Sequence, residues 1–383
     1  MASLLRDRAA TSAAMLAVFG DETLVRAALD FEAALARASA AEGLIAPEAA
    51  QVIAQACADI PIDVAALADE AAHAGTLALP LVRRLRERIA ARNPDVADLV
   101  HRGATSQDLA DTALMLQAKA GSALIVSEAG AVADLLAGLA EAHAETPMLG
   151  RTLLQAAAPI TFGLRAAGWL LGVDAARRRF EREAADALRL QLGGAVGTLA
   201  GLSPAVVERM ARDLGLEPAS LPWHSRRDGV AGTATALAIL IGAAGKVARD
   251  ISLMAQNELA EAFEPRTPGR GGSSAMPHKR NPTGCQIVLS AAIRAPALAS
   301  AILSGLPQEH ERGLGGWQAE APALATLFEL ADGALGALRE VLDGLEIDAA
   351  AMRRNLRAAD VGDDAGHAVA LAQRALAEYR RRG

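Results

Sequence analysis

A long segment without proline in the middle of the chain decides the fold. Residues 223–264 read WHSRRDGVAGTATALAILIGAAGKVARDISLMAQNELAEAFE, and prolines stand only at its borders, at positions 222 and 265. The apolar side chains recur at the three- and four-residue spacing of one helix face. They are Leu237, Ile241, Ala244, Val247, Ile251 and Met254. A proline-free run with this spacing predicts a long helix.

Other parts of the chain repeat this pattern. No proline lies between Pro159 and Pro204, and Val132, Leu135 and Leu139 show the same helical spacing. No window has the sustained two-residue alternation of a strand, so we expect strands to be minor. Long helices of this kind pack as an antiparallel bundle. The sequence therefore predicts an all-α fold with a central bundle of long helices.

The composition fits a compact enzyme that handles a small molecule. The chain has 383 residues, which is enough for two or three domains, and 52% of them are hydrophobic. Aromatic residues make up 3%, so the core must consist mainly of Ala, Leu, Val and Ile. The net charge of -7 gives no general attraction to nucleic acid or acidic lipid. An anionic substrate would therefore have to be held by local cations and backbone N–H groups.

Two further features concern the cellular setting. Cys57 and Cys285 lie far apart and outside any C-x-x-C motif, which argues against a disulfide framework or a zinc site. Asp7 and two arginines occupy the place where a signal peptide needs an apolar run. The longest apolar stretch, near Thr233–Gly245, is too short to span a bilayer. We expect a cytoplasmic enzyme without membrane or nucleic-acid partners.

The turn signals and the long proline-free windows divide the chain into three parts. Residues 1–104 are expected to form an N-terminal helical domain, and residues 105–344 the long-helix bundle domain. Residues 345–383 are expected to form a short C-terminal helical tail, a reduced third domain.

One loop concentrates chemistry between two helical runs. Residues 269–282, here called the signature loop, read GRGGSSAMPHKRNP. Glycines permit a mobile loop, a hydroxyl can transfer a proton, and lysine with backbone N–H groups can stabilise an enediolate. This grouping suits proton transfer beside a carboxylate. Composition alone leaves an ordinary solvated connection equally open.

The signature loop resembles the G-S-S-x-M-P-x-K-x-N motif of the fumarase/aspartase superfamily. The resemblance implies that Ser273 is the catalytic base, and that Lys279 and Asn281 hold a substrate carboxylate and the aci-carboxylate intermediate. It also implies substrate contacts for Ser274 and Met276. The superfamily has a three-domain helical fold, and it builds each active site from three subunits of a homotetramer. We therefore expect a homotetramer.

A second block begins a predicted helix. Residues 101–113 read HRGATSQDLADTA, and Thr105 with Asp108 forms the pattern of a capping box. A helix start also presents N–H groups and hydroxyls to an anion. The block resembles the T-S-x-D-x-x-D-T-A region of the same superfamily. This resemblance implies that Thr105 and Ser106 grip substrate carboxylates, with His101 as a further contact.

A third block follows Pro147 and Gly150. The residues alone, RTLLQ at 151–155, predict an ordinary helix start. The block also resembles the R-T-H-x-Q-P-A stretch of adenylosuccinate and argininosuccinate lyases. This implies substrate contacts for Arg151, Thr152 and Gln155, and it places Leu153 where those lyases have histidine.

A fourth block, residues 308–320, reads QEHERGLGGWQAE and resembles the corresponding stretch of the cycloisomerases in the superfamily. The resemblance implies that Arg312 clamps a carboxylate, whereas the residues alone allow an ion pair with a neighbouring glutamate. Residues that bind a nucleotide phosphate in adenylosuccinate lyases are replaced here by Gly315, Gly316 and Ala321. His224, in another cycloisomerase-like segment, is expected to be structural.

Taken together, the blocks resemble the branch of the superfamily that lactonises carboxymuconate. There a substrate carboxylate adds to a double bond; in reverse, a carboxylate with a pKa of about 4 leaves without proton assistance. Leucine in place of the histidine acid fits that reaction. The resemblance implies a small polycarboxylate substrate, and no metal ligand cluster or nucleotide fingerprint calls for a cofactor. A fumarate-releasing lyase, a sulfomuconate cycloisomerase and a catalytically silent scaffold are the alternatives.

Overall fold

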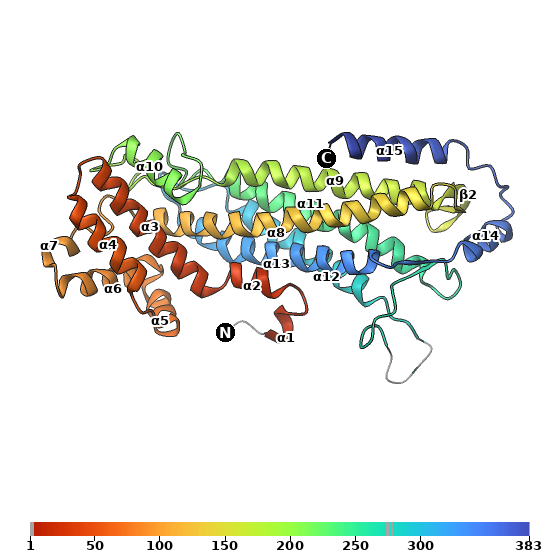
Figure 1. Ribbon diagram of the computed structural model, residues 1–383, viewed down its shortest axis with the longest axis horizontal. Helices are drawn as coiled ribbons and strands as arrows, with labels where there is room; N and C mark the ends of the chain where they lie inside the picture. The colour runs from red at the N-terminus through yellow and green to blue at the C-terminus, as the bar shows by residue number, and fades with distance from the viewer. Residues whose placement is uncertain (1–3, 273–275, 277–278, 383) are drawn as a thin grey trace.

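The centre of the protein is an elongated bundle of long helices (Figure 1). The computed structural model describes residues 4–272, 276 and 279–382. The long helices are α8 (Ser106–Ala142), α9 (Phe162–Ala187), α11 (Asp228–Met254), α12 (Thr283–Ser304) and α13 (Gly316–Leu342). The helix expected within residues 223–264 is α11, and the mainly helical fold confirms the predicted class.

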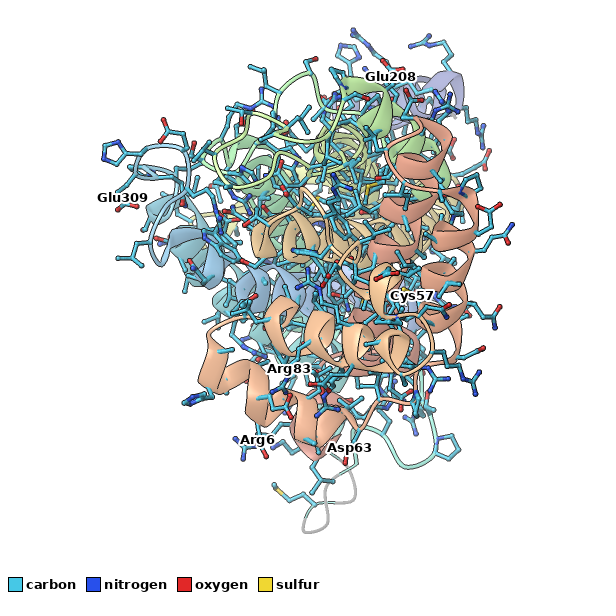
Figure 2. The ribbon with its side chains drawn as sticks, turned by 90° about the vertical axis from the view of Figure 1, so that its left-hand side faces the viewer. Arg6, Cys57, Asp63, Arg83, Glu208 and Glu309 are labelled. Carbon is cyan, nitrogen blue, oxygen red and sulfur yellow. The ribbon has the colours of Figure 1, made fainter. Side chains whose placement is uncertain are left out.

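One end of the bundle, here called the α3–α7 end, carries the N-terminal helices (Figure 1). Figure 2 looks onto this end, where Cys57 and Arg83 belong to those helices and Glu309 to the connection between α12 and α13. The connection between α9 and α11 contains α10 (Pro204–Leu214), which packs on α3. The N-terminal helices at this end are α3 (Asp21–Ala41), α4 (Pro47–Asp59), α5 (Val64–Ala74), α6 (Ala78–Ala90) and α7 (Pro94–Ala97). The first two helices, α1 (Leu4–Asp7) and α2 (Ala13–Val18), lie beside the bundle nearer its middle (Figure 1).

The opposite end, here called the hairpin end, carries two strands that project beyond α8 and α9 (Figure 1). Strand β1 (Pro147–Thr152) pairs antiparallel with β2 (Gln155–Thr161). Leu153 and Leu154 have φ values of 51° and 64°, the left-handed conformation that a two-residue type I′ turn requires. The helix start expected from these residues alone is therefore wrong, because the chain reverses direction here instead.

The C-terminal part stays on the surface of the bundle. Strand β4 (Glu346–Ile347) pairs with β3 (Ala262–Phe263), and α14 (Ala349–Ala358) packs against β1. Helix α15 (Ala368–Arg382) then runs back along α9 (Figure 1). The division into three domains stays a prediction.

The core is built from aliphatic side chains, as the composition predicts. On α11, the residues with helical spacing, from Leu237 to Val247 and Ile251, are fully buried.

Both cysteines are fully buried, and neither forms a disulfide. Burial raises the pKa of Cys57 to about 12, with a further contribution from Glu32. Burial also raises the pKa of the Cys285 thiol, so neither side chain is a thiolate near neutral pH.

Four of the long helices are long and apolar enough to cross a membrane, judged by length and composition alone. Helix α11 is one of them, so the expectation that its apolar stretch is too short for a bilayer is wrong. Within the single chain, 61% of the apolar window of α11 is buried, but only 28% of that of α12. Helix α12 thus leaves apolar side chains such as Ile293 uncovered in one copy of the chain.

Candidate active site

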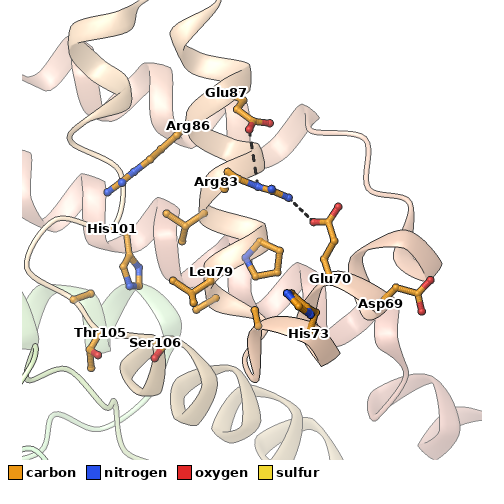
Figure 3. Close-up of a pocket in the computed structure, with 15 residues that line it drawn as sticks. Asp69, Glu70, His73, Leu79, Arg83, Arg86, Glu87, His101, Thr105 and Ser106 are labelled. Carbon is orange, nitrogen blue, oxygen red and sulfur yellow. Dashed lines mark hydrogen bonds and ion pairs between the residues drawn. The ribbon is translucent and has the colours of Figure 1, made fainter.

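Several of the predicted substrate-binding residues line one pocket at the α3–α7 end. This pocket, here called the helix-start pocket, has a volume of about 980 Å³ and includes His101, Thr105 and Ser106. Figure 3 shows them on one side of the pocket with Arg86, and Glu70 on the other side. The side of the pocket around the first turn of α8 combines hydroxyls, His101 and Arg86, which suits an anionic ligand, while Asp69, Glu70 and Glu87 are carboxylates elsewhere in its lining.

The first turn of α8 has the capping box that the sequence predicts. The backbone N–H of Thr105 donates to Asp108 Oδ2 at 2.9 Å. The guanidinium of Arg312 donates from Nη1 to Thr105 Oγ1 at 2.6 Å, although 207 positions separate the two residues. The fold thus brings the predicted carboxylate clamp to the predicted carboxylate-binding hydroxyl. Arg312 also donates to Gln107 rather than to a neighbouring glutamate in the described chain.

Asp108 ties this helix start to two other segments. Its carboxylate accepts hydrogen bonds from the backbone N–H groups of Gly193 and Gly194, each at 2.9 Å. His224 Nε2 lies 2.7 Å from Asp108 Oδ1, and both side chains are almost completely buried. Burial of His224 away from the pocket favours the structural role expected for it.

A buried ion cluster lies behind the same helix start. Arg227 has only 1% of its surface exposed and binds both oxygens of Asp111, at 2.8 and 2.9 Å. It also binds Glu320 near the start of α13, with a shortest distance of 2.5 Å. Burial raises the pKa of Glu320 above its ordinary value, while Arg227 acts in the opposite direction. The cluster joins α8, α11 and α13 at the end where Arg312 meets Thr105.

Sequence reasoning missed this cluster. The three residues are far apart in the sequence: Arg227 is 116 positions from Asp111 and 93 positions from Glu320. Each of them, taken alone, resembles an ordinary surface charge. The one available signal was position: Asp111 and Glu320 fall on apolar helix faces, where a charge needs a partner.

The residues predicted on the third block lie at the hairpin end instead. Arg151 forms two hydrogen bonds with the buried Glu261, at 2.7 and 2.9 Å, and so anchors the hairpin. Thr152 and Gln155 flank the turn and are exposed. Leu153, in the position of the lyase histidine, is 94% exposed. The hairpin therefore presents its tip to the outside of the single chain.

The described residues of the signature loop also lie at the hairpin end. Lys279 and Asn281 line a pocket of about 340 Å³ together with Arg266 and Arg270. The N–H of Asn281 donates to the carbonyl of Gly271 at 2.9 Å and closes the neck of the loop. Gly271 has φ 71°, and a Cβ there would lie 2.8 Å from the Asn281 carbonyl oxygen, so the neck requires glycine.

The structure describes only one of the three remaining predicted residues of this loop. Ser273 and Ser274 lie outside the described residues. Met276 is 42% exposed. Their roles stay predictions.

The candidate residues thus fall into two groups at opposite ends of the bundle (Figure 1). Helix α8 begins at the helix-start pocket and ends five residues before the hairpin. Its 37 residues correspond to a length of about 55 Å. One copy of the chain therefore does not bring Thr105, Ser106 and Arg312 together with Lys279, Asn281 and the hairpin.

Comparison with known proteins shows which proteins this chain is similar to. Residues 7–296 match a family described as lyase. A 3-carboxy-cis,cis-muconate cycloisomerase from Bradyrhizobium diazoefficiens is 46% identical over 366 residues, which cover 95% of this chain and 80% of that protein. A nitrosuccinate lyase from Streptomyces davaonensis is 42% identical, over 89% of this chain and 74% of that protein.

The solved structures agree with the sequence comparison. The crystal structure of the 3-carboxy-cis,cis-muconate lactonizing enzyme from Pseudomonas putida has a TM-score of 0.92 to this chain. The two are 38% identical, and the match covers 99% of each chain. The fold, the matched family and the identity over nearly the whole length confirm the resemblance drawn from the motifs. The chain belongs to the lyase family of the fumarase/aspartase superfamily.

Proposed function

We propose that the protein is a cycloisomerase that converts 3-carboxy-cis,cis-muconate to 4-carboxymuconolactone. The observation that carries this choice within the family is Leu153, which stands at the exposed hairpin tip where related lyases have histidine. An aliphatic side chain cannot protonate a leaving amine or hydroxyl. A carboxylate leaving group needs no such proton, because its conjugate acid has a pKa of about 4. The relatives named as cycloisomerases support the same choice.

The proposed reaction begins with the substrate held by its three carboxylates. Thr105, Ser106 and Arg312 supply two hydroxyls and a guanidinium from one end of a chain. Lys279 and Asn281 supply an ammonium and an amide from the hairpin end of another chain. Charge-assisted hydrogen bonds of this kind suit a polyanionic ligand.

In the chemical step, an oxygen of one carboxylate forms a bond to the distal carbon of the acceptor double bond. The alkene electron pair moves toward the adjacent carboxylate and gives an aci-carboxylate, which Lys279 and loop N–H groups stabilise. The Ser273 hydroxyl then gives its proton to the carbon beside that carboxylate. The product therefore carries one proton more and one negative charge fewer than the tricarboxylate substrate, and Ser273 regains a proton from solvent before the next turnover.

We further propose that the active site forms between copies of the chain in a homotetramer. Two observations support this. The two groups of candidate residues lie at opposite ends of the bundle in one copy, and α8, which runs between these ends, is about 55 Å long. The exposed apolar side of α12, including Ile293, needs a covering surface, and packing against the same helices of other copies supplies one. In this arrangement the apolar helices pack within an assembly in the cytoplasm rather than in a bilayer.

The decisive experiment is turnover of 3-carboxy-cis,cis-muconate by the purified protein, followed by ultraviolet absorbance and by NMR of the product. We expect loss of the conjugated diene and formation of a carboxymuconolactone. The same preparation is tested with nitrosuccinate, adenylosuccinate, argininosuccinate and sulfomuconate. Release of fumarate from one of these without lactone formation from carboxymuconate would overturn the proposal.

A further inference from the structure

A buried carboxylate from the N-terminal helices contacts the histidine of the helix-start pocket. Glu32 on α3 has 1% of its surface exposed, and its Oε1 lies 2.5 Å from His101 Nδ1. The other oxygen, Oε2, is buried and has no hydrogen-bond partner among residues 4–272, 276 and 279–382. Burying a carboxylate with one oxygen unsatisfied costs stability, and an apolar side chain would fill this space at lower cost. The position of Glu32 is therefore better explained by what it does to His101.

His101 is itself held in an unusual conformation. Its φ is 62°, in the left-handed region that non-glycine residues seldom adopt. Such backbone strain persists where the surroundings impose it, and it is common at ligand-binding positions. The ring lies against Phe31 on one side and lines the helix-start pocket, with 16% of the side chain exposed. Because Nδ1 contacts Glu32, the second nitrogen, Nε2, points away from the carboxylate.

Charged groups from three elements act on this ring. Glu32 on α3 and Asp108 on α8 are negative, and Arg86 on α6 is positive. Burial lowers the pKa of His101, but the two carboxylates outweigh it, so the pKa is raised above its ordinary value. The protonated form is therefore favoured up to a higher pH than in a free histidine, and it is lost as the pH rises through the raised pKa.

We propose that Glu32 is a positioning residue that keeps His101 doubly protonated and directs its Nε2–H toward a substrate carboxylate in the helix-start pocket. The inference rests on the proposed function, because a polycarboxylate gives this cation its ligand. It adds a second cation to a wall that already carries Arg86 and the Thr105 and Ser106 hydroxyls. A neutral His101 would leave the negative charge of Glu32 uncompensated near an anionic substrate.

The test compares Glu32→Gln with Glu22→Gln. The first variant keeps the side-chain shape and an oxygen that accepts from Nδ1–H, but it removes the charge. Glu22 is an exposed residue at the start of the same helix and does not line the pocket. The Michaelis constant for carboxymuconate is measured from pH 5.5 to 9 for wild type and both variants.

We expect the Michaelis constant of the wild type to increase as the pH rises and His101 loses its proton. In Glu32→Gln the Michaelis constant should begin to increase at a lower pH. At neutral pH it should be about tenfold above that of the wild type, while kcat should change by less than about twofold. Glu22→Gln should follow wild type. A merely structural role for Glu32 would lower the amount of folded enzyme without moving the pH profile. An unmoved profile in Glu32→Gln would therefore overturn the proposal.

His101→Asn gives a second variant, because asparagine tolerates positive φ but does not titrate in this range. Its Michaelis constant should be high and nearly independent of pH; retention of the wild-type pH dependence would also overturn the proposal. The pKa of His101 can also be measured without turnover, by NMR titration of protein with isotope-labelled histidine. The signal that is missing in His101→Asn belongs to His101, and tricarballylate serves as the bound tricarboxylate. The His101 pKa should fall in Glu32→Gln, because the negative charge that favours the imidazolium is removed, and tricarballylate should raise it in the wild type.

The two proposals fail in different ways. If the wild type does not lactonise carboxymuconate, the proposed function fails, and the NMR titration still decides whether Glu32 sets the pKa of His101. If the wild type turns over normally and the titration is unchanged in Glu32→Gln, only the proposed role of Glu32 toward His101 fails.

Discussion

Candidate residues contact one another at one end of the bundle, and several of them are exposed at the other. At the α3–α7 end, Thr105 and Arg312 contact each other, and the buried cluster around Arg227 lies directly behind them. At the hairpin end, Thr152, Leu153 and Gln155 are exposed at a turn. The first end is arranged within one chain, whereas the tip of the hairpin at the second end extends into solvent. This difference supports the proposal that the hairpin end completes a site on another copy.

The largest expected effect concerns the residue proposed to move the proton. Ser273→Ala should lower kcat by about a thousandfold, because general acid–base groups contribute about 10²–10⁴-fold. The measurement is lactone formation followed by ultraviolet absorbance, with circular dichroism to check folding. Ser304→Ala, at the exposed C-terminal end of α12, is the control and should keep wild-type activity. Normal turnover by Ser273→Ala would refute its assignment.

The next effect tests whether the α3–α7 end depends on its buried ion cluster. Arg227→Met leaves Asp111 and Glu320 buried without their cation, so we expect a loss of about 3–5 kcal/mol in the free energy of unfolding. Arg37→Met is the control, because Arg37 and Asp213 form an exposed pair, and it should cost less than about 1 kcal/mol. Urea denaturation of both variants measures the difference. Equal losses would show that the cluster does not stabilise this end.

A smaller effect separates binding from stability at the same end. Arg312→Gln removes the cation that donates to Thr105, and kcat/KM should fall about ten- to a hundredfold through a weaker grip on a substrate carboxylate. Arg226→Gln, an exposed arginine of the same end, serves as the control. Steady-state kinetics of both variants provide the comparison. Unchanged kinetics in Arg312→Gln would remove Arg312 from the proposed site.

The smallest effect tests the hairpin end. The double variant Leu153→Asn, Leu154→Gly has the residues that a type I′ turn prefers, and it should relieve about 1–2 kcal/mol of backbone strain per residue. If the leucines contact another copy, the tetramer should nevertheless dissociate at higher protein concentration than the wild type. Mass photometry on dilution measures this, with the exposed Leu221→Asn as control. Unchanged dissociation would show that the leucines make no such contact.

Sequence reasoning predicted the long helices because their pattern is local. The spacing from Leu237 to Ile251 is the spacing of a buried helix face, and α11 buries it. The capping box at Thr105 and Asp108 is confirmed for the same reason, since both residues lie within one turn. The hairpin was missed, because two leucines at a left-handed turn carry none of the asparagine or glycine that marks it.

The sequence could not predict contacts between residues that lie far apart along the chain. Nothing near Glu32 indicates that it meets His101, 69 positions later, or that Arg227 lies between two carboxylates from other helices. Motifs identified the individual candidates, such as Arg312 and Lys279. Their distribution over opposite ends of the bundle became visible only with the fold.

The complete burial of both thiols has a practical consequence. Since Cys57 and Cys285 are inaccessible and protonated, maleimide reagents should leave the native protein unlabelled under mild conditions. A single surface cysteine, introduced as Leu153→Cys, would then carry a fluorophore or spin label at one defined place without removal of the natural ones. In the proposed tetramer, distances between such probes would report directly where each hairpin tip lies relative to the neighbouring copies.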